Sequence, residues 1–460
     1  MTLNRREFLK TASGGFGAIA LAGLLNDEAK AEAIDPLASR AGHFPAKAER
    51  VIFLYSTGGV SHVDTFDRKP KLIADHGKSI TASRWLNKPG KFERFLIRPR
   101  WEFKQYGQSG AWISDLFPNF GSVVDDVCIL NAMHCDSDGH DKATLAAHTG
   151  SAQFARPSHG AWVSYGLGTV NRNLPSFMVL APAAPYAGAQ TWGSDFLPGC
   201  HQGTHVIPGK DPLPNLQPRV ASLELQQMEL DLLGKFNRQH LEKRAADQGL
   251  NARVRSFETA FGMQREAPAA FDLSGETEET LKLYGLDRGA TSGFGWQCLV
   301  ARRLLERGVR FVQIWSGNDN SFPRRNWDSH ENVRRDHGPL SRGFARGASA
   351  LIQDLKQRGM LDDTLVIWVG EFGRTSYSQG RLSKENYGRD HHPRCFSLWM
   401  AGGGVKGGFS YGQTDAYGYN VADKDGNAVN PSKDVFTPGI VHVHDLQATI
   451  LQLLGIDHLR

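Results

Sequence analysis

The 460-residue chain predicts an α/β fold built on a mostly parallel β-sheet. Three observations favour this class. Continuous apolar runs such as Val51–Tyr55 and Thr364–Val369 are typical of parallel strands buried on both faces. Helical patterns alternate with these runs along the chain. Histidines and carboxylates lie beside one end of five such runs, and an open parallel sheet binds its ligands at the carboxyl ends of its strands.

The elements follow from apolar runs and helical spacing in chain order. The expected strands are Val51–Tyr55, Val127–Met133, Ser176–Ala181, Val309–Trp315, Thr364–Val369 and Cys395–Met400. The expected helices are 142–149, Gly295–Arg307, Leu340–Gln357 and Asp445–Leu454. Residues 68–110 should form a long surface excursion, and residues 183–218, which are rich in Pro and Gly, should be irregular. The alternation predicts a sheet covered by helices on both faces.

A helical insertion is expected at about 219–290. From residue 221 to residue 246, four large apolar side chains recur at helical spacing, namely Leu225, Met228, Leu232 and Phe236. Such stripes usually face a core, so packing against the rest of the protein is the expected role of this one.

The N-terminus, residues 1–33, is similar to a twin-arginine signal peptide. Arg5 and Arg6 precede an apolar stretch at 11–25, and small residues suited to cleavage follow. This predicts export by the twin-arginine translocase to the periplasm or beyond, with one domain at 34–460. No later segment is long and apolar enough to predict a membrane span in the mature chain.

Composition argues against two other classes of function. The formal net charge is only +5 and no Lys or Arg run dominates, so we do not expect a nucleic-acid-binding protein. The cysteines number five and match no CxxC pattern, which argues against a cysteine-based metal site or thiol catalysis.

Carboxylates and imidazoles at the strand ends predict a divalent metal site. Mixed ligands of this kind suit Zn²⁺ or Mn²⁺, and oxygen-only sets suit Ca²⁺ or Mg²⁺. Each cluster alone could be a cap, a turn or a surface pair, so the prediction depends on their joint arrangement. Arg374 and Arg389 could bind an oxyanion bidentately. The candidate metal ligands are Asp64, Asp328, His330, Glu371, His391 and His392.

Five motifs together resemble a bacterial exported family, the domain of unknown function numbered fifteen-oh-one, over nearly the whole mature chain. The motifs are GGVSHVDTFD at 58–67, WDSH at 327–330, GEFGRT at 370–375, GRDHHP at 388–393 and AGGGVKGG at 401–408. The family is grouped with the alkaline phosphatase/sulfatase clan. The resemblance therefore implies an alkaline-phosphatase-like three-layer sandwich and a site for one or two metal ions.

The clan pattern implies metal ligands at Asp64, at Asp328 and His330, and at His391 or His392. A His beside the acidic residue Glu371 would also be expected, and this chain has none. The clan's nucleophile precedes a Thr-Gly pair by about nine residues, which from Thr149 leads to His140. A metal-bound hydroxide, His140 itself or a displaced Ser137 could attack, or His140 could be a further ligand.

The leading hypothesis is an exported metal-dependent hydrolase of small-molecule or glycan phosphate or sulfate esters. In it, His140 occupies the place of the attacking group, and Arg374 or Arg389 stabilises the developing oxyanion. The alternatives are a non-catalytic clan member that binds anionic glycans or envelope components, and a transferase of phosphoryl-linked groups.

Overall fold

A computed structural model describes residues 35–460 except 84–90, 217–221, 243, 245–247, 318–325, 381, 384–386 and 432–436. The predicted signal peptide at 1–33 lies outside the described residues. Within the described part, every helix is too short or too polar to cross a bilayer.

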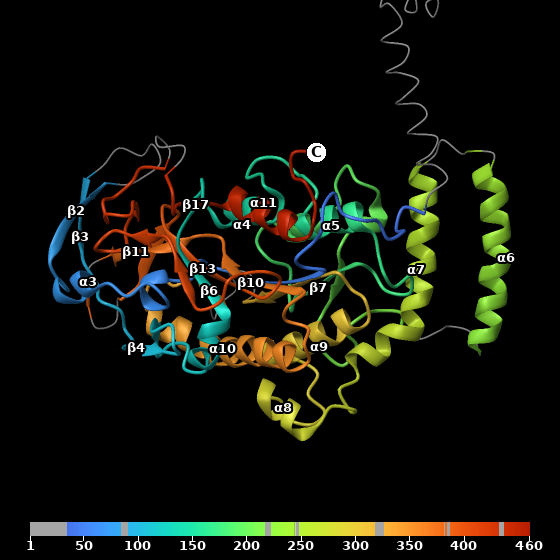
Figure 1. Cartoon of the computed structure of the whole chain (residues 1–460), viewed down its shortest axis with the longest axis horizontal. Coiled ribbons are helices and arrows are strands. Elements are labelled where there is room, and N and C mark those ends of the chain that lie inside the picture. Colours follow the sequence, from blue (N-terminus) through green and yellow to red (C-terminus); the bar gives the residue numbers. More distant parts are fainter. Residues whose placement is uncertain are drawn as a thin grey trace, which may run out of the picture.

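A mixed, mostly parallel sheet forms the centre of the molecule (Figure 1). Among the described residues it has nine strands, in the order β14-β6-β13-β10-β1-β9-β7-β8, with β17 paired to β6. These strands are β1 (Arg50–Ser56), β6 (Val127–His134), β7 (Phe177–Leu180), β8 (Thr204–Val206), β9 (Phe311–Ser316), β10 (Thr364–Gly370), β13 (Phe396–Ala401), β14 (Phe409–Tyr411) and β17 (Val441–His442).

The direction of the strands decides which loops meet. β10, β1, β9, β7 and β8 run parallel, and β13 runs antiparallel to both β10 and β6. β6 therefore has the same direction as β10, and the two end at one edge of the sheet. Because β13 is reversed, it begins at that edge. The segment just before β13 is thus brought to the exits of β6, β10, β1 and β9.

Helices cover both faces of the sheet (Figure 1). The helices of the described residues are α3 (Pro70–Ala74), α4 (His140–Thr149), α5 (His159–Leu167), α6 (Leu223–Glu242), α7 (Gln248–Phe271), α8 (Glu278–Tyr284), α9 (Phe294–Glu306), α10 (Val333–Gln357) and α11 (Val443–Leu453). α4, α5 and α11 lie over one face, and α8, α9 and α10 lie over the other. The side chains of β1 alternate between the two cores, Ile52 and Leu54 in one and Val51, Phe53 and Tyr55 in the other.

Smaller elements decorate the edges of the sheet. Four two-stranded ribbons pair β2 (Ser79–Ser83) with β3 (Lys91–Phe95), β4 (Phe103–Tyr106) with β5 (Ala111–Ser114), β11 (Gly373–Ser378) with β12 (Arg389–His392), and β15 (Gln413–Thr414) with β16 (Val421–Ala422). Short 3₁₀ helices are η1 (His62–Asp64), η2 (Phe120–Asp126), η3 (Gly188–Trp192) and η4 (Gly199–His201).

The predicted α/β class is confirmed, and each of the six predicted strands is a strand of the central sheet. Helix starts were less accurate. α10 begins seven residues before the predicted Leu340, because the Asn332 side chain caps it by accepting a hydrogen bond from the Arg335 amide at 3.0 Å. α5, β8 and the β11–β12 ribbon, all of which are short, were not predicted.

The expectation that the stripe on α6 packs against a core is wrong. Leu225, Met228, Leu232 and Phe236 are all exposed, by 43% to 62%. Helical periodicity shows that apolar residues share one face, but it does not show what that face meets.

A buried ion network holds α8, α9 and α10 together. Arg302 on α9 is 2% exposed and donates hydrogen bonds to Glu276 (2.8 Å), Glu306 (2.8 Å) and Asp354 (3.0 Å). The Tyr284 hydroxyl on α8 donates to the same Asp354 carboxylate at 2.9 Å.

Removing the guanidinium should destabilise this side of the protein far more than removing the hydroxyl. Arg302→Met removes the cation that contacts all three carboxylates, each of which keeps a contact with Arg303 or Arg358. We expect a loss of about 3 kcal/mol in the free energy of unfolding. Tyr284→Phe should cost about 1 kcal/mol. Urea denaturation of both variants measures the difference, and near-equal losses would show that the network does not depend on Arg302.

Candidate metal centre

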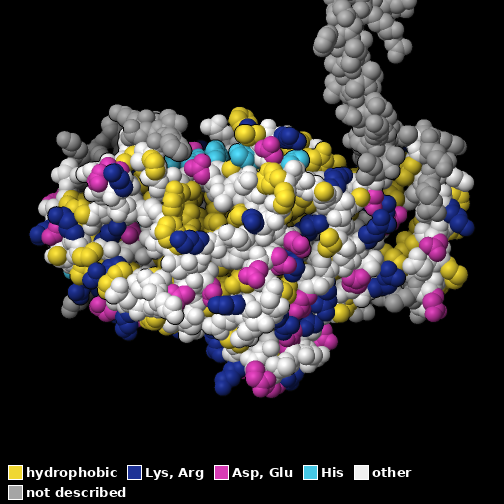
Figure 2. Space-filling view, in the orientation of Figure 1, with side chains coloured by type: hydrophobic (Ala, Val, Ile, Leu, Met, Phe, Trp, Pro, Cys, Tyr) yellow, Lys and Arg dark blue, Asp and Glu magenta, His cyan; other side chains and the backbone are white. Residues whose placement is uncertain are grey.

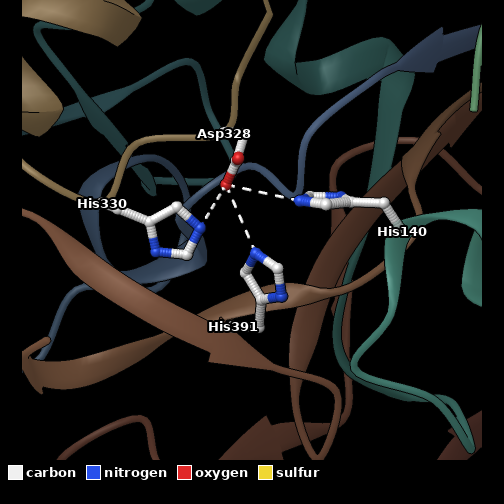
Figure 3. Close-up of side chains that lie close together, drawn as sticks. All are labelled: His140, Asp328, His330 and His391. Atoms are coloured by element: carbon white, nitrogen blue, oxygen red, sulfur yellow. Dashed lines mark hydrogen bonds and ion pairs between the residues drawn. The ribbon is translucent and has the colours of Figure 1, made fainter. Parts of the chain in front are cut away.

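Four side chains converge at the edge of the sheet where β6, β9 and β10 end. One ligand atom from each of His140, Asp328, His330 and His391 lies within 4.8 Å of the others. Figure 3 shows the three imidazoles directed at the carboxylate of Asp328. The distances from their Nε2 atoms to Asp328 Oδ1 are 3.4 Å for His140, 2.8 Å for His330 and 3.3 Å for His391. The arrangement offers three nitrogens and one oxygen to a single point.

Strand direction explains why residues so distant in sequence meet here. His140 is the first residue of α4, just beyond the exit of β6. Asp328 and His330 lie between β9 and α10, and His391 lies in β12, just ahead of the reversed strand β13. The sequence predicted that ligand-type residues meet at strand ends, and three of the six predicted ligands, Asp328, His330 and His391, lie in this group.

Two glycines permit the close approach of these segments. A side chain at Gly58, which has φ +117°, would place its Cβ 2.3 Å from the amide nitrogen of Asp328. A Cβ at Gly388 would lie 2.0 Å from the carbonyl carbon of His330. Backbone hydrogen bonds from Tyr387 to Glu331 (2.6 Å) and from Arg389 to Ser329 (3.2 Å) join the same two segments.

Each imidazole is held by an acceptor on its other nitrogen. Nδ1 of His140 contacts Glu371 Oε1 at 2.7 Å, and Nδ1 of His391 contacts the carbonyl oxygen of Asp138 at 2.7 Å. Nδ1 of His330 contacts the side-chain oxygen of Gln379. Since an acceptor requires a proton on Nδ1, a neutral ring presents the Nε2 lone pair to the centre. This is the usual arrangement around metal-binding histidines.

The arrangement of the four side chains is more favourable with a divalent cation between them than without one. Three Nε2 lone pairs beside a carboxylate oxygen would repel it, and three protonated rings would crowd like charges in a site that is largely buried. Nε2 of His140 is buried and has no hydrogen-bond partner. A cation among the four atoms would satisfy it. Three nitrogens and one oxygen are a suitable set for Zn²⁺ or Mn²⁺.

The electrostatics of the site favour an ionised carboxylate. Burial raises the pKa of Asp328. Arg374, whose Nη2 lies 2.5 Å from Oδ1, and the three histidines lower this pKa by more than burial raises it. The pKa of Asp328 is therefore well below its usual range. Burial lowers the pKa of His391 to about 4, which keeps that ring neutral. For His140, burial lowers the pKa, but contacts with Asp328 and Glu371 raise it above its ordinary value. A metal ion would have to compete with a proton there.

Two aromatic rings fix the orientation of the imidazoles. Tyr186 stacks on His140 with ring centroids 4.4 Å apart and an interplanar angle of 9°. Phe372 lies 5.0 Å from the His140 ring and 4.6 Å from the His391 ring. The rings therefore have little freedom to turn away from the centre.

Glu371, proposed as a metal ligand, supports the group from outside it. Its side chain is fully buried, and Oε1 accepts hydrogen bonds from the Gly58 amide and from His140 Nδ1, both at 2.7 Å. Its contacts fit a role in orienting His140, which is itself placed to be a ligand.

Asp64 and His392 also lie outside the four-residue group. Asp64 accepts hydrogen bonds from Ser61 Oγ (2.6 Å), Arg389 Nε (2.7 Å) and the Arg100 amide (3.0 Å). Although burial raises its pKa, Arg389 lowers it below the ordinary value overall. The His392 ring is directed to the carbonyl of Tyr419, and burial lowers its pKa to about 3. Their predicted role as ligands stays a prediction.

Both candidate arginines are fully buried and contact protein acceptors. Arg374 donates to Asp328, to the carbonyls of Gly58 and Gly59, and to that of Arg389. Arg389 donates to Asp64 and to carbonyls of Ile97, Arg98 and Thr375. These contacts favour a role in positioning the carboxylates, and binding of a substrate oxyanion stays a prediction.

Sequence reasoning missed the two groups that anchor His330 and His391. Gln379 follows the β11–β12 ribbon's first strand, which was not predicted, and the Asp138 anchor is a main-chain carbonyl. A backbone oxygen carries no signal in the sequence, so only the fold could identify it.

The chain combines an α/β sheet with a candidate metal site at the carboxyl ends of its parallel strands. It belongs to the family described as "Protein of unknown function (DUF1501)", whose model matches residues 48–460. No curated protein matches the sequence.

Several solved structures show a distant likeness. They include the PsFucS1 sulfatase from Pseudoalteromonas sp., at 13% identity over 96% of this chain and 71% of that one, with a TM-score of 0.36. The alkaline phosphatase from the Antarctic bacterium TAB5 matches at 10% identity over 90% and 99%, with a TM-score of 0.34. The lipoteichoic acid synthase LtaP from Listeria monocytogenes matches at 8% identity over 94% of this chain and 78% of that one, with a TM-score of 0.30. At these values no site residue is transferred from them.

Metal content tests the assignment of the four ligands. Protein loaded with Zn²⁺ or Mn²⁺ should bind about one ion per chain, and Asp328→Ala or His391→Ala should reduce this to near zero, because each removes one of four ligands. Elemental analysis after gel filtration measures it. His458→Ala, at an exposed histidine near the C-terminus, is the matched control and should retain the ion. Full metal retention in Asp328→Ala would rule out the assignment.

A second outcome concerns the close backbone approach at Gly388. Gly388→Ala should destabilise the protein by about 1–3 kcal/mol and weaken metal binding, since the added methyl group pushes the His330 segment away. Thermal unfolding with and without metal tests both effects. Gly338→Ala, on α10 with open space around its Cβ position, is the control and should do neither. Equal behaviour of the two variants would contradict the steric argument.

Proposed function

We propose that this protein is an exported, metal-dependent hydrolase of phosphate or sulfate esters. The observation that carries the proposal is the convergence of three imidazole Nε2 atoms on Asp328, with each Nδ1 held by an acceptor. A divalent ion held there would polarise an ester oxygen and increase the acidity of a water molecule. Export rests on the twin-arginine-like sequence at 1–33 and is part of the proposal.

The charges around the site support an anionic substrate. Asp64, Asp328 and Glu371 carry three negative charges, and Arg374 and Arg389 carry two positive ones. With a divalent ion the sum becomes positive, which would attract a phosphate or sulfate group. Without the ion these five residues sum to a negative charge, and a proton on His140 would only neutralise it, so we expect substrate binding to depend on the metal.

We also propose that the centre holds one ion. Asp64, the carboxylate that could serve a second ion, is already neutralised by Arg389 at 2.7 Å and fully buried. His140 faces the centre as a ligand, which leaves a water molecule as the proposed attacking group. Glu371 would hold His140 in place and would disperse the charge on its ring.

A cavity beside the loop between β6 and α4 offers room for the rest of a substrate. It has a volume of about 680 Å³ and is lined by Asp136, Asp138, Lys142, Arg156 and His444, among others. The loop that lines it carries both the Asp138 carbonyl that anchors His391 and the start of α4 at His140. A glycan or other polar group attached to the ester would fit a cavity of this size and polarity.

Hydrolysis of model esters tests the proposal. Chelator-treated protein should be inactive, and reloading with Zn²⁺ or Mn²⁺ should restore cleavage of p-nitrophenyl phosphate, bis(p-nitrophenyl) phosphate or p-nitrophenyl sulfate. Glu371→Gln should weaken metal affinity by about 10- to 100-fold, because it disturbs the partner of a metal-binding histidine. His458→Ala should leave both properties unchanged.

One result would refute the proposed hydrolase. Protein that holds one ion per chain but cleaves none of these esters, in water or with an added alcohol acceptor, would leave the metal centre standing and refute the hydrolase. Binding of sulfated or phosphorylated glycans by such protein would then indicate a non-catalytic role.

A further inference from the structure

α6 carries an apolar stripe that the described part of the chain leaves exposed. Leu225, Met228, Leu232 and Phe236 are 43%, 62%, 56% and 59% exposed. By contrast, the apolar residues of α9 and α10 are buried in the core beneath the sheet. Contiguous exposed apolar surface of this kind marks an interaction site more often than chance exposure.

The stripe faces away from the helix beside it. α6 lies along α7 at one end of the molecule (Figure 1), and the yellow side chains of this pair are visible at its surface (Figure 2). The partly buried residues of α6 include Leu230, Gly234 and Leu241, which recur at helical spacing on a second face. At about 100° per residue, that face lies roughly opposite the stripe through Leu232. Packing against α7 therefore leaves the stripe open.

The charges on α6 point to the occupant. Its first half carries the exposed acidic residues Glu224, Glu229 and Asp231, and its second half carries the exposed Lys235. When two such helices lie antiparallel, the acidic half of each lies beside Lys235 of the other. Asp231 and Lys235 lie along the same edge of the stripe, one turn apart. In an antiparallel pair centred on Leu232, Asp231 of each copy would therefore lie beside Lys235 of the other copy.

We propose that the stripe binds the same stripe of a second copy of this chain, with the two α6 helices antiparallel about a two-fold axis near Leu232. A two-fold contact uses one surface twice, so a single self-complementary stripe suffices. Met228 of each copy then lies near Phe236 of the other. Phe257 on α7 is a further exposed apolar side chain of the helix pair, at 68%. The acidic residues beside the stripe would be repelled by an anionic lipid surface, which argues against a membrane as the occupant.

Cysteine cross-linking distinguishes the antiparallel pair from other arrangements. In full-length protein, Leu232→Cys should form a disulfide-linked dimer under mild oxidation, because residue 232 meets its own copy at the axis. Leu225→Cys should not link to itself, since the two copies of that residue lie about 20 Å apart along the helices. An equimolar mixture of Leu225→Cys and Gln239→Cys should link. Self-linking of Leu225→Cys as readily as of Leu232→Cys would overturn the antiparallel arrangement.

The concentration dependence of the mass tests the interface itself. Sedimentation equilibrium of the wild type should show a reversible monomer–dimer equilibrium, and Leu232→Glu should move its midpoint to at least roughly tenfold higher concentration, since a charge would be buried. Lys235→Asp should weaken the dimer, and the double variant with Asp231→Lys should restore it. Leu459→Glu, at an exposed leucine outside α6, should have no effect.

Two results would refute the proposal. One is a wild type that stays monomeric at every concentration while circular dichroism shows an intact fold. The other is flotation of monomeric protein with vesicles of phosphatidylethanolamine and phosphatidylglycerol, abolished by Leu232→Glu, which would assign the stripe to a membrane. Metal content should be the same in all α6 variants, so failure here is distinguishable from failure of the metal centre.

Discussion

One carboxylate oxygen, Asp328 Oδ1, organises the candidate site. Three imidazoles and the Arg374 guanidinium are directed at it from segments that follow or precede four different strands of the sheet. A buried anion of this kind needs compensating charge, and the fold supplies it from several directions. The reversal of β13 matters most here, because it brings the β12 segment with His391 to the edge where the parallel strands end.

Much of this site could be predicted from sequence, for a physical reason. Ligand-type residues after apolar runs lie at one edge of the sheet when those runs are parallel strands, and Asp328 and His330 were found in this way. His391 precedes its strand and reaches the same edge because β13 is antiparallel. His140 was located only as a place in a motif, with its role left open. The partner of Asp64 could not be predicted, because nothing in the sequence shows that Arg389 reaches across more than 300 residues to neutralise it.

In the fold, as in the site, the elements could be predicted from sequence patterns, but their tertiary contacts could not. The six predicted strands of the central sheet are apolar runs whose burial on both faces leaves few alternatives, and their positions were correct. The stripe on α6 has an equally clear period, but its surroundings are set by tertiary structure. α9 and α6 are both amphipathic by sequence, and α9 lies on the sheet while α6 lies outside α7. Periodicity identifies a face that needs a partner and leaves the partner unspecified.

The pairing of arginine with carboxylate also bears on what the centre can bind. A guanidinium is a fixed cation that cannot be removed by chelation or by moderate changes of pH, since its own pKa lies far above neutrality. With Arg389 on Asp64, that carboxylate stays neutralised, and the exchangeable charge is the one that a metal ion would bring at Asp328. A site with one exchangeable cation should lose its metal in a single step on chelation, whereas a pair of bridged ions would be released in two. The Arg389–Asp64 contact is therefore the feature on which the proposed count of one ion depends.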